Sequence, residues 1–171
     1  SQEPISLEER IGLFADRKNV LRSMNVRYVL SGYEIHDEDF VEVLHTQVGN
    51  CNTGVYVYEL TDYWPRYFVA SSVEAVSPYD FDTVISRLHL AHERGKVFVE
   101  QMTDGRSQIT DGIVPVVAMI DGDTMYFNVS INEDSLLFIG NAWLPGWQAT
   151  VDGEPAEIIK TNYVYMGVWL E

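Results

Sequence analysis

The chain has 171 residues, of which 26 are acidic and 11 are lysine or arginine, and its formal net charge is −15. Such an acidic excess disfavours nucleic acid and anionic lipid as partners, because both require a basic surface. A hydrophobic content of 46% favours a packed globular domain over a disordered chain, the single cysteine excludes an internal disulfide, and no stretch reaches the ~20 apolar residues that span a bilayer.

At this length we expect one domain covering residues 1–171. A helix begins at Ser6 and reaches Arg22, with acidic residues in its first turn and basic residues in its last. Strands are then predicted over residues 26–30, 41–46, 55–60 and 66–70. The second and third of them alternate at period two and pair across a connection at 49–52.

In the second half of the chain, a helix is predicted to begin at Pro78, because proline is favoured at the first helical position, and to end at Gly95. Residues 102–112 are interpreted as a loop, and strands are predicted over 97–101, 114–120, 124–131 and 136–141, with Pro115 at a strand start or edge.

Turn signals mark the hairpins. Asp121-Gly122 separates two of these strands, and Asp152-Gly153 turns the chain between two more, because both central positions of a type I′ turn require positive φ. Short, regularly spaced strands joined by hairpin turns favour a mainly β fold. We predict an antiparallel β-sandwich, jelly-roll or Greek-key like, with two α-helices packed on it, over an α/β sheet.

The residues that could form a catalytic or metal site match no specific sequence motif. His89 and His92 stand three apart with Glu93 beside them, but this spacing matches no zinc motif, and an ordinary helical pair is the preferred interpretation. Cys51 has no histidine beside it in the sequence. The acidic clusters that could bind calcium also have local uses as a loop, a helix start and a hairpin turn; they are 37–39, 80/82 and 121/123. We therefore predict no catalytic residue, metal or cofactor.

Aromatic residues near the C-terminus provide the best ligand hypothesis, because flat rings presented together can stack on sugars while polar neighbours accept hydrogen bonds from hydroxyl groups. The alternative, which we prefer, is that the rings close the core. The candidate carbohydrate-binding residues are Trp143, Trp147, Asp152, Asn162, Tyr163 and Tyr165. Arg66, beside Trp64 and Tyr67, is a candidate for contact with an anionic head group, although a structural ion pair is the preferred reading.

Three separated blocks of the sequence resemble a known family. They are MNVRYVL at 24–30; VYVYE at 55–59 with PRYFV at 65–69; and a C-terminal block of Pro145-Gly146-Trp147, Val151-Asp152-Gly153, Asn162-Tyr163 and Gly167-Val168. In this order they are similar to the soluble domain of YfhO-type bacterial membrane proteins, which are related to membrane glycosyltransferases that use lipid-linked sugars.

The resemblance implies that this chain is the extracytoplasmic C-terminal domain of a polytopic cell-membrane protein. Its catalytic acids would lie in the membrane-embedded half, before residue 1, and that half would be the partner of this domain. The domain would cap the active site or position the acceptor, in contact with a glycan or lipid-linked sugar. Two other function classes stay open: a carbohydrate-binding module that uses Trp143 and Trp147, and a secreted hydrolase.

Overall fold

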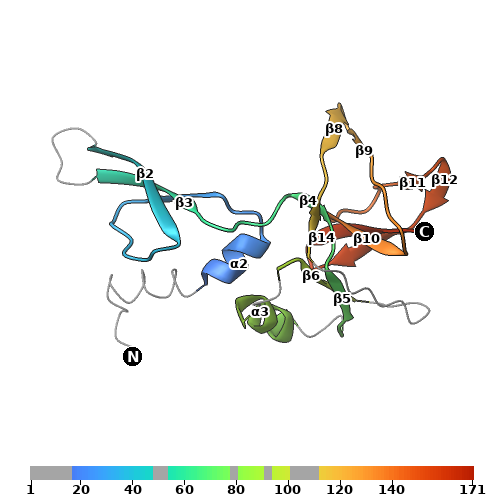
Figure 1. The fold of residues 1–171 in the computed structure, drawn as a ribbon, viewed down its shortest axis with the longest axis horizontal. Coiled ribbons are helices and arrows are strands. Elements are labelled where there is room, and N and C mark those ends of the chain that lie inside the picture. The colour runs from blue at the N-terminus through green and yellow to red at the C-terminus, as the bar shows by residue number, and fades with distance from the viewer. Residues whose placement is uncertain (1–16, 48–53, 78–80, 91–93, 101–111) are drawn as a thin grey trace. The chain divides into compact units, whose positions relative to one another are not determined.

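The computed structural model describes residues 17–47, 54–77, 81–90, 94–100 and 112–171 (Figure 1). By its internal contacts the chain divides into two compact units, Ser1–Trp64 and Pro65–Glu171, which are described separately below. The described residues are mainly β with two short helices, which confirms the mainly β prediction. Neither described helix is long and apolar enough to cross a bilayer. The assignment of residues 1–171 to a single domain stays a prediction.

The first unit contains one short helix and a three-stranded antiparallel sheet. Helix α2 covers Lys18–Ser23, and the strands are β1 (Tyr28–Ser31), β2 (Phe40–Gln47) and β3 (Gly54–Leu60), in the order β1-β3-β2. The pairing of β2 with β3 confirms the predicted pairing of 41–46 with 55–60. Most of the helix predicted from Ser6, and the connection at 49–52 with Cys51, lie outside the described residues.

Period-two alternation places the core of this unit on one face of its sheet. Val29, Phe40, Tyr58 and Leu60 are buried there together with Ile35. The Tyr58 hydroxyl accepts a hydrogen bond from the backbone N–H of Ile35 at 2.9 Å, so this phenol is buried with a partner.

The second unit is built on a seven-stranded sheet that curls into a half-barrel. Its strand order is β5-β6-β13-β14-β10-β4-β7, and two separate hairpins, β8–β9 and β11–β12, complete the unit. Helix α3 covers Phe81–Leu90. The strands are β4 (Tyr67–Val69), β5 (Ser72–Ala75), β6 (Lys96–Val99), β7 (Val114–Pro115), β8 (Ala118–Asp121), β9 (Thr124–Phe127), β10 (Ser135–Ala142), β11 (Ala149–Val151), β12 (Glu154–Ala156), β13 (Ile158–Thr161) and β14 (Tyr165–Leu170).

One strand pair departs from the predicted antiparallel pattern. Strands β5 and β6 are parallel, with Val73 opposite Val97, so the sheet is mixed and the prediction of a purely antiparallel sheet is wrong at this edge. The reason lies in the connection, because parallel neighbours need a crossover and α3 lies between these two strands in the chain. Strand β5 itself was not predicted.

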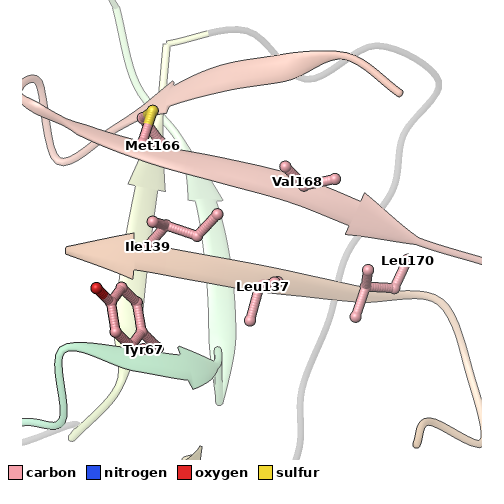
Figure 2. Close-up of a cluster of buried hydrophobic side chains, with 6 residues drawn as sticks. All are labelled: Tyr67, Leu137, Ile139, Met166, Val168 and Leu170. Carbon is pink, nitrogen blue, oxygen red and sulfur yellow. The ribbon is translucent and has the colours of Figure 1, made fainter. Parts of the chain in front are cut away.

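Strand β10 is buried on both faces. Leu137 and Ile139 point to one face, where they join Tyr67 of β4 and three residues of β14 in a cluster of buried side chains (Figure 2). Phe138 points to the other face and stacks on Phe68 with ring centroids 4.6 Å apart. A run of continuous burial is what a central strand covered on both faces requires.

Of the two predicted Asp-Gly turns, one is confirmed in its backbone geometry and the other is shifted by one residue. Asp152 and Gly153 have φ values of 51° and 90°, as the two central residues of a type I′ turn require. The turn predicted at Asp121-Gly122 lies one residue further along the chain: Asp121 ends β8 opposite Thr124, and the central residues are Gly122, with a φ of 57°, and Asp123. The predicted strand 114–120 is divided into β7 and β8, and Pro115 occupies an edge strand, as expected.

Candidate functional site

The second unit contains an open groove with a volume of about 880 Å³. This volume falls within the range of ligand sites, about 300–1,000 Å³. Its floor is one face of the sheet, because β10 and β14 contribute alternate residues to it. Five floor residues belong to the cluster drawn in Figure 2: Leu137, Ile139, Met166, Val168 and Leu170.

The walls of the groove differ from its floor. Residues 123–127, which include all of β9, and residues 144–152, which include all of β11, line it consecutively. Successive residues of a strand point to opposite faces, so a strand that lines a cavity with every residue presents its edge. The groove is therefore bounded by the backbone edges of two hairpins over an apolar floor.

The lining combines apolar surface with acidic groups. Methionine, phenylalanine, valine, isoleucine and leucine dominate, and all charged lining residues are acids: Asp123, Asp152 and Glu171. Trp147 also lines the groove and is 36% exposed. Such a surface can hold an apolar body, while its carboxylates accept hydrogen bonds from hydroxyl or ammonium groups.

The structure brings two of the six predicted carbohydrate-binding residues together in this groove, Trp147 and Asp152. Trp143 lies elsewhere: it packs against the buried cluster, and the Lys160 ammonium lies 5.0 Å from the centroid of its ring. This cation–π contact and the packing account for Trp143 without a ligand.

The other three predicted residues have structural partners outside the groove. Asn162 is buried, and its side-chain oxygen accepts the N–H of Phe98 at 2.8 Å. The Tyr163 hydroxyl donates to the carbonyl of Ser77 at 2.7 Å. Tyr165 makes an edge contact with Phe138 on the sheet face opposite the groove, and burial raises the pKa of its phenol. The six residues therefore do not form one surface.

Arg66 is held by neighbours within the second unit. Its Nε donates to the side-chain oxygen of Asn141 at 3.1 Å, and its guanidinium carbon lies 5.7 Å from the centroid of the Tyr67 ring. The Tyr67 hydroxyl donates to the same Asn141 oxygen at 3.3 Å. The guanidinium therefore makes a cation–π contact with Tyr67, and Asn141 takes the place of the predicted acidic partner in the hydrogen bond.

Sequence reasoning missed an ionic network in the first unit. The Lys18 ammonium binds Asp37 at 3.1 Å and Asp39 at 2.5 Å, and Arg22 binds Asp39 at 2.7 Å. The hydrogen bond to Lys18 lowers the pKa of the Asp39 carboxyl, and the same bond raises the pKa of Lys18. Two of the acids considered as calcium ligands at 37–39 therefore anchor α2.

Among the residues that the structure describes, no cluster of histidine, cysteine and acidic side chains has the arrangement of a metal site. His92 and Glu93 of the candidate histidine pair, as well as Asp80 and Cys51, lie outside the described residues. His89 belongs to α3, and the structure does not describe its side chain.

The strand edges that wall the groove were not predicted as a site. The only available signal was indirect: two short hairpins with two-residue turns, each leaving one edge to be covered.

Comparison with known proteins does not narrow the function of this chain, since no protein-family model, curated protein or solved structure matches it significantly.

Proposed function

We propose that this chain is a non-catalytic binding domain on the extracytoplasmic side of a membrane protein of the YfhO type. In this role it docks on the membrane-embedded half of the same protein and positions the acceptor while a sugar is transferred from a lipid-linked donor to an envelope polymer or lipid. The observation that carries the proposal is the groove, whose apolar floor and acidic rim provide a binding surface.

The three blocks that resemble the family support the proposal by their places in the fold. The 24–30 block enters β1, the 55–59 block lies in β3 and the 65–69 block runs into β4. The C-terminal block supplies Trp147 and Asp152 to the groove. A resemblance carried by sheet strands and by groove residues is consistent with a shared fold and a shared binding surface.

We also propose a sandwich-like arrangement for the second unit. Side chains of both hairpins, among them Phe127 of β9 and Val151 of β11, pack against the buried cluster on the groove face of the sheet. In this arrangement the hairpins supply a partial second layer over the seven-stranded sheet, as the inner face of a β-sandwich requires.

The proposal is tested in the full-length protein expressed in its own membrane. Ten or so predicted spans ahead of Ser1 in the gene are expected, and a lone signal peptide would contradict the assignment. Transfer of labelled sugar is then compared between the wild type and Trp147→Ala at equal protein levels. Loss of an aromatic contact worth about 1 kcal/mol lowers transfer roughly fivefold, whereas unchanged transfer argues against a role of the groove. Asp134→Asn, an exposed acid outside the groove, is the matched control.

A carbohydrate-binding module is the second candidate, favoured by the exposed ring of Trp147 and the carboxylate of Asp152, which both line the groove. It predicts that the isolated chain binds glycans, seen as a change in tryptophan fluorescence that Trp147→Ala removes. Trp143→Phe, which changes a packed ring outside the groove, retains the response. No fluorescence change at millimolar sugar would exclude this module, and turnover of glycosides by the isolated chain would instead support the secreted hydrolase.

A further inference from the structure

The groove is walled by strand edges, and this geometry restricts what can fill it. In the β8–β9 hairpin, Asp121 is opposite Thr124 across a two-residue turn, and Ile120 is opposite Met125. Antiparallel pairs alternate between hydrogen-bonded and non-hydrogen-bonded, beginning with the bonded pair that flanks such a turn. The backbone N–H and C=O groups of Met125 and Phe127 therefore point away from β8, toward the free edge of β9.

The same alternation applies to the second hairpin. Val151 is opposite Glu154 next to the turn, and Thr150 is opposite Pro155, so the backbone groups of Thr150 point away from β12. Within the described ranges, Met125, Phe127 and Thr150 form no backbone hydrogen bond to a segment beyond their own hairpins. Both edges thus offer donors and acceptors next to the groove.

We propose that the groove binds an extended peptide segment, which pairs through its backbone with the free edge of β9. Its alternate side chains contact the apolar lining of the groove, of which Leu144 and Trp147 are the exposed part on the β11 side. Binding by strand addition uses backbone hydrogen bonds for affinity and alternate side chains for specificity. This inference rests on the groove geometry and is independent of sugar transfer.

Charge defines the peptide further. The rim carries Asp123 at the β8–β9 turn and Asp152 at the β11–β12 turn, with Glu171 as the third lining acid. A peptide with lysine or arginine flanking its apolar residues complements this rim, and a peptide with acidic flanks is repelled. The favoured ligand is therefore an extended, alternating apolar segment with basic ends.

The test uses the full chain and the synthetic peptide Lys-Val-Thr-Ile-Thr-Val-Lys, with binding followed by NMR and amide hydrogen exchange. We expect saturable binding and at least tenfold slower exchange of the Met125 or Phe127 amide. N-methylation of alternate peptide amides on the pairing edge removes donors and should weaken binding at least tenfold, and glutamate flanks should weaken it severalfold.

A double variant, Asp123→Asn with Asp152→Asn, separates the charge effect from the fold. Asparagine is favoured in type I′ turns, so the β11–β12 hairpin is retained. The variant should lose the preference for lysine over glutamate flanks, and Asp134→Asn should keep it. Absence of peptide binding would overturn the proposal. So would equal binding of the N-methylated peptide, or binding of dodecyltrimethylammonium at the same site with equal affinity, because either would show that apolar contact suffices.

Discussion

Substitution of Asn162 tests whether this residue is structural. It follows β13 with a φ of 44°, a left-handed conformation that asparagine tolerates better than most residues. Its backbone N–H donates to the carbonyl of Phe98 at 2.8 Å, while its side-chain oxygen accepts the N–H of Phe98 at 2.8 Å. Asn162 and Phe98 are both buried, so this reciprocal pair of bonds ties the β13–β14 turn to β6 away from water.

The expected cost follows from two separable contributions. Asn162→Ala leaves the buried Phe98 amide without its acceptor, which costs about 1–3 kcal/mol, and places alanine in the left-handed region for about 1–2 kcal/mol more. Asn162→Gly relieves the backbone strain but still leaves the Phe98 amide unpaired. It also lowers the free energy of unfolding by about 0.4–1 kcal/mol, because glycine gives the unfolded chain more conformational entropy. Asn162→Asp keeps both the acceptor and the tolerance of positive φ, so the change should be below about 1 kcal/mol.

Urea unfolding followed by tryptophan fluorescence measures these differences, since three of the four tryptophans belong to the unit that contains Asn162. Hydrogen exchange of the Phe98 amide gives a local measurement, and protection should fall in the alanine and glycine variants and persist in the aspartate variant. Unchanged stability and unchanged Phe98 protection in Asn162→Gly would refute the structural assignment. If Asn162 contacted a sugar instead, its substitution would weaken sugar binding and leave unfolding unaffected.

Two further predictions concern an ion pair and a close backbone approach. The lowered pKa of Asp39 means that its stabilising effect is complete above its unfolded pKa of about 4 and is lost as the pH falls through the folded value. Asp39→Asn should therefore cost about 1 kcal/mol at pH 7 and flatten the acid limb of the stability curve measured by urea unfolding. Gly140→Ala would place a Cβ 2.7 Å from the backbone oxygen of Arg66 and should lower the free energy of unfolding by about 1–3 kcal/mol. Gly32→Ala, where nothing lies within 4 Å, should stay within about 0.5 kcal/mol, and equal effects of the two glycine substitutions would contradict the packing argument.

Local signals were sufficient for those parts of the fold that neighbouring residues determine. Asp152-Gly153 specifies its turn because the required φ values belong to these two residues. The alternation in 41–46 and 55–60 predicted two strands and their pairing because they are close in sequence. Strand β5, with the sequence SVEA, has no comparable signal; it is a strand because it pairs with β6 beyond a helix, and this pairing also makes the sheet mixed.

The site was less predictable than the fold because its determinants are distant in the sequence. The structural role of Asn162 depends on Phe98, 64 positions away. Trp143 and Trp147 look equivalent in the sequence, yet Lys160 and the buried cluster engage one ring, and the other lies on the groove. The pattern of aromatic residues therefore led to the region of the groove, but it did not distinguish a packed ring from an exposed one.

The sequences of the edge strands support our proposal that the groove is a binding surface. Proline and β-bulges are common means by which proteins keep sheet edges from pairing with other chains. Pro115 lies on the edge strand β7, Pro155 removes a donor from the outer edge of β12, and a register shift between Glu42 and Leu44 interrupts the edge strand β2. Strands β9 and β11 contain neither proline nor lysine, and their ladders show no bulge. The edge strands β1, β5 and β8 also lack proline, lysine and bulges, but none of them lines the groove. The unprotected edges of β9 and β11 are those that lie beside an apolar cavity, where a segment could pair with them.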